Sequence, residues 1–166
     1  MDKIEIRLAR PADANSIARL HSHWQGGEFD SFLKKTTAEL AGEGVFSKLV
    51  TIVAHSGKEF LGFAKIFHFQ VEDFEECFTA PVGHYLTGVC VEKKYRAKTV
   101  GSRLTKFRIE YLKPITNRIY YFTDSDNLPS IQLHAKIGFQ FLTHDFTFPG
   151  ARALTGQKLS LFKLDC

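Results

Sequence analysis

Residues 89–104 join an apolar run that ends at Val91, a basic turn, and an amphipathic helix expected to start near Thr99. The first backbone N–H groups of a helix have no partner inside it, so they can bind phosphate oxygens, helped by the helix dipole. The stretch is rich in basic residues, and Glu92 is the only acidic residue among them. The basic residues are Lys93, Lys94, Arg96, Lys98, Arg103, Lys106 and Arg108, and the small turn residues are Ala97, Gly101 and Ser102. The stretch therefore predicts a cradle for a diphosphate.

This stretch resembles motif A of the GNAT superfamily, the acetyl-CoA-dependent N-acetyltransferases, which reads roughly Val-x-Pro-x-Tyr-Arg-Gly-x-Gly-x-Gly-x-x-Leu. The matching residues are Val91, Tyr95, Arg96, Gly101 and Leu104. Lys93 replaces the frequent Pro, Ala97 the first small residue, and Thr99 the middle Gly. The Thr99 departure matters most, because Gly there lets the backbone approach the phosphates closely.

A second stretch resembles motif B of the same superfamily, Asn-x-x-Ala/Ser-x-x-Leu-Tyr-x-Lys-x-Gly-Phe. The matching residues are Asn127, Ser130, Leu133, Lys136, Gly138 and Phe139. His134 stands where Tyr is usual. From the residues alone, Asn127 is a good helix N-cap and Gly138 a good C-cap, so a capped helix leading into a strand is expected. Because both motifs occur in the family's order, the chain is identified as a member of the superfamily.

Length and composition indicate one domain. A chain of 166 residues can bury a sizeable core, and we expect a single GNAT domain over residues 1–166. No apolar run approaches the length of a membrane span, and the charged N-terminus lacks the apolar core of a signal peptide. The cysteines Cys77, Cys90 and Cys166 show no metal-like spacing, so we expect reduced thiols, no metal and a cytoplasmic protein. The net charge of +4 is modest and sits largely in the basic turn, so no nucleic-acid partner is expected.

The pattern of apolar residues predicts an α+β fold in the order β-α-α-β-β-β-α-β-α-β-β, with helices covering a mostly antiparallel sheet. Strands are expected at 4–8, 49–55, 60–70, 84–91, 118–123, 139–148 and 157–164. Helices are expected after Pro11, over 29–42, from Thr99 to before Pro114, and over motif B. The helix from Thr99 has an expected apolar face of Val100, Leu104, Phe107 and Tyr111. This order is that of the GNAT fold, in which strand 84–91 splays from strand 118–123.

The resemblance implies where acetyl-CoA binds. The pantetheine arm would pair like an added strand with the backbone of Val89 and Val91, and the diphosphate would take N–H bonds from residues 97–102. The cofactor-binding residues implied are Val89, Cys90, Val91, Arg96, Ala97, Lys98, Thr99, Val100, Gly101, Ser102, Asn127 and Ser130.

The resemblance also suggests how acetyl transfer proceeds. The N–H of Val89 would polarise the acetyl carbonyl. His134 would protonate the leaving thiolate as imidazolium or donate a hydrogen bond to sulfur as neutral imidazole, and a packing or capping role is the alternative. Tyr85 and Thr87 occupy strand positions where family members place base-like residues, but neither is a good base at neutral pH. His84 is one residue out of phase with them, so the general base stays open.

Acceptor contacts are expected from Trp24, Phe29, Glu72 and Asp73, by analogy with the family's first two helices and the loop before the splayed strand. Core packing for the aromatic residues and solvent exposure for the acidic ones are the alternatives. Acidic residues would attract a cationic acceptor. The expected function is direct transfer of acetyl from acetyl-CoA to a primary amine of a small molecule in a ternary complex, by a monomer or homodimer. A catalytically impaired acyl-CoA-binding module and a protein N-acetyltransferase are the alternatives, and a nucleic-acid-binding domain is a more distant one.

Overall fold

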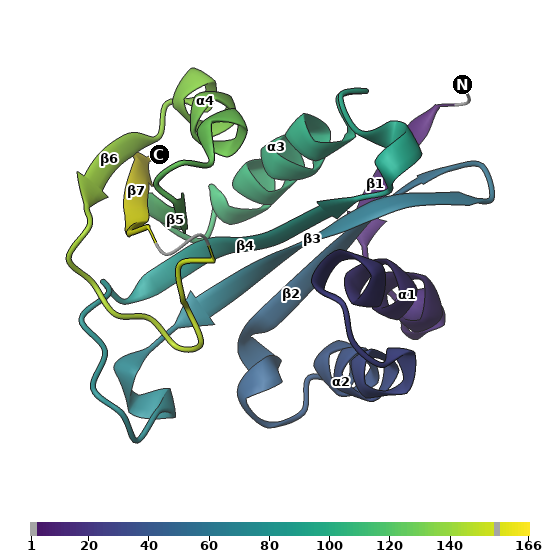
Figure 1. Cartoon of the computed structure of the whole chain (residues 1–166), viewed down its shortest axis with the longest axis horizontal. Coiled ribbons are helices and arrows are strands. Elements are labelled where there is room, and N and C mark those ends of the chain that lie inside the picture. Colours follow the sequence, from purple (N-terminus) through teal and green to yellow (C-terminus); the bar gives the residue numbers. More distant parts are fainter. Residues whose placement is uncertain (1–2, 155–156) are drawn as a thin grey trace. The chain divides into compact units, whose positions relative to one another are not determined.

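The computed structural model describes residues 3–154 and 157–166. Its elements follow the predicted order (Figure 1). The α-helices are α1 (Ala14–Gln25), α2 (Phe29–Ala41), α3 (Val100–Leu112) and α4 (Leu128–Ile137). The strands are β1 (Ile4–Leu8), β2 (Leu49–Ser56), β3 (Glu59–Phe69), β4 (Gly83–Val91), β5 (Arg118–Asp124), β6 (Gln140–Thr143) and β7 (Leu159–Asp165).

The strands hydrogen-bond in the order β1-β2-β3-β4-β5-β7-β6. The β1–β2, β2–β3, β5–β7 and β6–β7 pairs are antiparallel, and the β4–β5 pair is parallel. The predicted α+β class with a mostly antiparallel sheet is therefore confirmed. The chain divides into two compact units, one formed by the residues up to Phe67 with Thr87–Glu110, the other by His68–Leu86 with Tyr111–Cys166.

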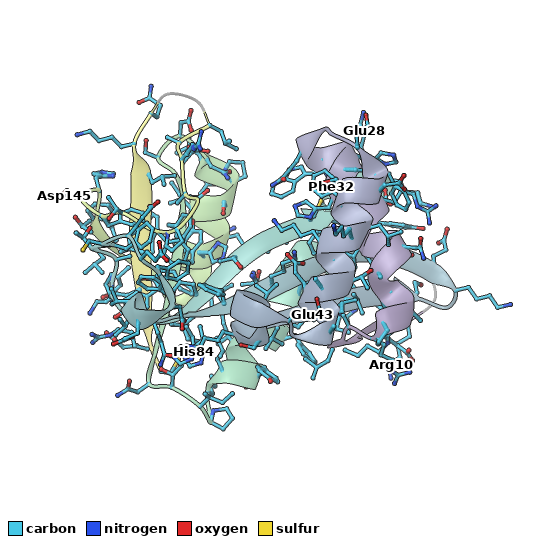
Figure 2. All side chains as sticks on the ribbon, turned by 90° about the horizontal axis from the view of Figure 1, so that it is seen from below. Arg10, Glu28, Phe32, Glu43, His84 and Asp145 are labelled. Atoms are coloured by element: carbon cyan, nitrogen blue, oxygen red, sulfur yellow. The ribbon has the colours of Figure 1, made fainter. Side chains whose placement is uncertain are left out.

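The first unit holds β1, β2, most of β3, the second half of β4, and three helices. Figure 1 shows α1 and α2 on one side of these strands and α3 on the other. Figure 2 labels Phe32 on α2, whose ring lies 4.7 Å from that of His21 on α1. Ile17 and Leu20 of α1 pack on Val53 of β2 and Phe63 of β3, and all four are at most 3% exposed. This apolar contact fixes α1 on the strands.

The same unit contains one part-buried and one buried ion pair. Arg7 of β1 donates two hydrogen bonds to the carboxylate of Asp13, at 2.7 and 3.0 Å, and the Arg10 N–H donates a third at 2.7 Å. Lys65 of β3 lies 2.5 Å from the Glu39 carboxylate of α2, with both side chains less than 10% exposed. These charges connect helices to strands through the layer that apolar contacts would otherwise fill.

The buried face of α3 differs from the predicted one. Val100 and Leu104 are buried as expected, but Phe107 and Tyr111 are half-buried. The remaining buried residues of the helix are Thr105, Arg108, Ile109 and Leu112. Thr105 and Arg108 were missed because they are polar residues at core positions, and the apolar Ile109 and Leu112 also lay outside the predicted face.

The second unit holds the first half of β4 together with β5, β6, β7 and α4. The register of β4 with β5 runs from His84↔Ile119 to Leu86↔Tyr121, whereas β4 continues to Val91, the pattern expected of a splayed pair. An aromatic core surrounds the first half of β4. Its rings are those of Phe69, Tyr85, Tyr120, Phe122 and Phe148.

The prediction of one strand over 139–148 was wrong, because β6 ends at Thr143. Beyond a register shift at Phe141/Thr143, the chain leaves β7. The main chain of Thr147 bonds instead to residues 79–80: its carbonyl accepts from the Ala80 N–H at 3.0 Å, and its N–H donates to Thr79 Oγ1 at 2.9 Å. This path brings Phe148 into the aromatic core.

Candidate active site

The turn before α3 adopts an unusual backbone. Ala97 has φ of 59° and Thr99 has φ of 64°, and they are the non-glycine residues with positive φ in the described part of the chain. The left-handed region costs about 1–2 kcal/mol for a residue with a Cβ, and a β-branched residue such as Thr is a rare occupant. Both residues therefore hold a backbone conformation that glycine adopts freely, so the motif's departure from glycine at Thr99 does not prevent that conformation.

Three hydrogen bonds stabilise this turn. The Thr99 carbonyl accepts from the Arg103 N–H at 2.9 Å and from Ser102 Oγ at 2.8 Å, and Arg96 Nε donates to the Val91 carbonyl at 3.1 Å. Val100 anchors the helix start, with 1% of its surface exposed. Strained backbone that is over-determined by its surroundings is typical of ligand-binding turns, and successive N–H groups in such a turn form an anion-binding concavity.

The positive charge at this turn is smaller than the sequence indicates. Lys93, Arg96 and Lys98 are exposed beside it. Lys94 instead bonds to Glu59 at 2.8 Å, which raises the pKa of Lys94, and Tyr95 donates its hydroxyl to the same carboxylate. Arg108 is buried and adds no charge at the surface, which corrects its assignment to the basic cluster.

The second half of β4 lies close against β3. A Cβ built on Gly62 of β3 would lie 2.4 Å from the Cys90 carbonyl oxygen, so only glycine fits there. The Glu92 N–H donates to the Leu61 carbonyl at 2.9 Å just beyond. Burial raises the pKa of the Cys90 thiol to about 11, so this thiol stays protonated at neutral pH. The Cys90 thiol is therefore not a reactive sulfur, and the expected contribution of the Cys90 backbone to cofactor binding stays a prediction.

Motif B forms α4 with the predicted caps. Asn127 Oδ1 accepts from the Ser130 N–H at 3.4 Å, and Asn127 Nδ2 donates to Thr123 Oγ1 at 2.9 Å. Gly138 ends the helix with φ of 112°. Asn127 thus ties the start of α4 to the end of β5.

His134 lies on the buried side of α4, 4% exposed, with its ring stacked on Tyr121 at a centroid distance of 3.7 Å. Its Nδ1 lies 2.9 Å from the Ser130 carbonyl oxygen. Because a carbonyl only accepts, Nδ1 carries the proton, and in the neutral ring the lone pair is on Nε2. Donation from Nε2 would therefore require the imidazolium form, and the catalytic role of His134 stays a prediction.

A family model decides the classification. The model of the acetyltransferase (GNAT) family matches residues 17–139, which include both motifs. The chain belongs to the GNAT family. The prediction of a GNAT acyltransferase is thereby confirmed. The prediction that the family uses acetyl-CoA is confirmed as well.

Solved GNAT structures share the fold across almost the whole chain. The putative acetyltransferase yncA from Salmonella typhimurium, solved with acetyl-CoA, is 17% identical, with a TM-score of 0.69 over 98% of this chain and 93% of that one. The PaiA N-acetyltransferase from Thermoplasma acidophilum, solved with coenzyme A, is 15% identical, with a TM-score of 0.68 over 99% of both chains. The ribosomal-protein-S18-alanine N-acetyltransferase from Escherichia coli is 14% identical, with a TM-score of 0.66 over 98% and 94%. Comparison with curated proteins gives no significant match.

Tyr85 and Thr87 of β4, where family members are expected to place base-like residues, lie in different environments. Tyr85 is fully buried in the aromatic core, and its hydroxyl donates to the Pro81 carbonyl at 2.6 Å. Burial raises the pKa of Tyr85 well above its ordinary value, so its hydroxyl stays protonated at neutral pH, and a catalytic role of Tyr85 stays a prediction. Thr87 is half-buried, and its carbonyl accepts from Arg108 at 3.0 Å.

His84 and His68 form a stacked pair that the sequence pattern did not reveal. Their rings lie 4.2 Å apart and nearly parallel, with His84 at the start of β4 (Figure 2). Burial and the neighbouring His68 lower the pKa of His84, so it is neutral at pH 7 and has a lone pair able to accept a proton. The pair could have been predicted only from the pairing of β3 with β4, which brings His68, near the end of β3, next to His84.

The expected acceptor residues are distributed over both units. Trp24 and Phe29 are 46% and 37% exposed, and Trp24 lines a hollow of about 470 Å³ in the first unit. The other residues lining that hollow are Leu20, His23, Glu92, Lys93 and Arg96. In the second unit, Glu72 is exposed and Asp73 half-buried, both in a 3₁₀ turn. Their acceptor role stays a prediction.

Two kinds of feature are absent from residues 3–154 and 157–166. No group of three or more His, Cys, Asp or Glu is placed to hold a metal ion. None of the helices is long and apolar enough to span a membrane.

Proposed function

We propose that the chain, acting as one catalytic domain, transfers the acetyl group of acetyl-CoA to a primary amine of a small molecule by direct attack in a ternary complex. The left-handed backbone at Ala97 and Thr99, directly before α3, supports the proposal, because turns of this kind and helix starts offer backbone N–H groups to anions. Charge-assisted bonds from such groups are worth about 1.5–3 kcal/mol each. Two or three of them suit the diphosphate of the donor.

The backbone of β4 would hold the rest of the donor. Val89 and Val91 would pair with the amide groups of the pantetheine arm as a neighbouring strand would. The Val89 N–H would stabilise negative charge on the acetyl oxygen as the amine nitrogen attacks the carbonyl carbon. This role needs the main chain of Val89 and no particular side chain.

Two proton transfers complete the reaction. The amine must lose a proton before it attacks, and the sulfur must gain one as the carbon–sulfur bond breaks. We assign the second to Nε2 of His134 in its imidazolium form. For the first, His84 is the titratable residue of β4 whose lowered pKa leaves it neutral at pH 7. In this proposal His134 is the general acid and His84 is the general base.

Variants of His134 test the assignment. His134→Phe keeps the ring stack on Tyr121 but removes both nitrogens, and we expect kcat to fall by roughly 10²-fold or more. His134→Tyr restores the residue usual in the family and should retain more activity. His144→Gln, a histidine change at an exposed position after β6, is the control. Unchanged turnover in His134→Phe would show that His134 only packs.

The acceptor class is tested with purified protein, acetyl-CoA and two panels of acceptors, small amines and peptides with free N-termini or lysines. Release of the thiol of coenzyme A reports turnover. The proposal expects turnover with members of the amine panel. Turnover confined to peptides would make the chain a protein N-acetyltransferase. Binding of coenzyme A without turnover on either panel would indicate an impaired binding module.

A further inference from the structure

Arg108 of α3 is among the largest fully buried side chains of the protein, with 1% of its surface exposed. Its guanidinium lies against the main chain of two strands. Nη1 donates to the Lys65 carbonyl of β3 and to the Thr87 carbonyl of β4, both at 3.0 Å. Nη2 donates to Thr105 Oγ1, one turn earlier on α3, at 3.1 Å. One side chain thus links three elements.

This cation has no ionic partner in the described part of the chain. None of the ion pairs involves Arg108, and Nε has no hydrogen-bond acceptor there. Burial alone lowers the pKa of Arg108, to about 9, and no carboxylate opposes it. A buried charge without a partner lowers stability, and apolar residues of similar volume often stabilise such sites. Fold stability therefore gives no reason for an arginine at this position.

The position of the guanidinium, beside an irregular point of β4, gives a reason for an arginine here. Thr87 is followed by Gly88, whose φ of 41° breaks the extended backbone of β4, and Val89 comes next. A strand interrupted in this way leaves carbonyls outside the regular ladder. The two N–H groups of Nη1 bind one carbonyl on each strand at this point.

We infer that Arg108 is a positioning residue that fixes the main chain of β4 at Thr87 and Gly88, and thereby the direction of the Val89 N–H. The inference rests on the proposed function, in which that N–H stabilises charge on the acetyl oxygen. Arg108 itself touches no reacting atom. The start of α3 that would bind the diphosphate is two helical turns away along the same helix, so donor binding does not depend on the guanidinium.

The test uses Arg108→Met, which keeps the length and apolar volume of the side chain, and Thr105→Val, which keeps its shape but removes the Nη2 acceptor. The expected result for Arg108→Met is a fall in kcat of roughly 10–100-fold, because a displacement of about 1 Å at a reacting group has an effect of this size. The KM for acetyl-CoA and the Kd for coenzyme A should change less than threefold. Thr105→Val should lower kcat by a smaller factor, and Arg118→Met, at an exposed arginine of β5, should leave it unchanged.

A second readout is independent of turnover. In ¹⁵N-labelled protein, the amide resonances of Gly88 and Val89 should shift in Arg108→Met and in Thr105→Val, while those of residues 97–102 stay in place. Unshifted Gly88 and Val89 amides, or a kcat within twofold of wild type in Arg108→Met, would overturn the inference. If Arg108→Met does not fold, the Gly88 and Val89 amide shifts in Thr105→Val decide. A wild-type protein without turnover would refute the proposed function, whereas the amide shifts would still decide the role of Arg108.

Discussion

The strained turn before α3 predicts that glycine, compared with alanine, stabilises the protein at Thr99 and destabilises it at the neighbouring Lys98. Thr99 has φ of 64°, which costs about 1–2 kcal/mol for a residue with a Cβ, and alanine there would have the same strain. Glycine removes the strain but adds about 0.5–1 kcal/mol of backbone entropy to the unfolded chain. Thr99→Gly should therefore be more stable than Thr99→Ala by about 0.5–1 kcal/mol. For a chain of this length, 1 kcal/mol corresponds to roughly 2–4 °C in Tm.

Lys98 provides the matched control, because it lies between the two strained residues and has an ordinary negative φ. Lys98→Gly should be less stable than Lys98→Ala by about 0.5–1 kcal/mol. Urea denaturation of the four variants, followed by circular dichroism, measures both differences. Equal stability of Thr99→Gly and Thr99→Ala, or a glycine penalty at both positions, would refute the left-handed conformation on which the cradle depends.

Three further changes test the packing around the site. Lys65→Met leaves the Glu39 carboxylate buried alone and should destabilise by about 3–5 kcal/mol in urea denaturation, and adding Glu39→Leu should recover most of this; an additive double variant would contradict the pairing. Gly62→Ala places a Cβ 2.4 Å from a β4 carbonyl and should lower Tm by several degrees, so an unchanged Tm would contradict this contact. Burial is the largest single effect and opposes ionisation of Asp13, but the hydrogen bonds from Arg7 and the Arg10 N–H, together with nearby positive charge, outweigh it and lower the pKa of Asp13. Stability from Asp13 is thus present above about pH 4 and lost as pH falls through the lowered pKa, so Asp13→Asn should destabilise by about 1–2 kcal/mol at pH 7 and by less at pH 3. A difference that is the same at both pH values would contradict this linkage.

Much of the fold could be predicted from local signals. Asn127 and Gly138 cap α4 as their residue types indicate, because capping depends on nearby backbone groups. The turn at Ala97 and Thr99 was located by its motif, although neither residue prefers the conformation it adopts. Here the surrounding hydrogen bonds override the local preference.

The parts that could not be predicted depend on contacts between distant segments. From its residue type alone, Arg108 is predicted to be a surface charge. It binds instead to carbonyls of β3 and β4 that lie 43 and 21 residues away along the chain. The strand expected through Phe148 ends early because Thr147 bonds to the loop at Thr79. His68 pairs with His84 only because two strands bring them together. No local pattern contains this information.

The most direct test of the cradle is a titration of ¹⁵N-labelled protein with coenzyme A. We expect the amide resonances of residues 97–102 to shift with a common, saturating dependence on ligand concentration, and Tm to rise, because a ligand that binds only the folded state stabilises it. Dephospho-coenzyme A, which keeps the diphosphate, should shift the same amides, and pantetheine, which lacks it, should not. Unshifted amides in this turn at saturating coenzyme A would contradict the account.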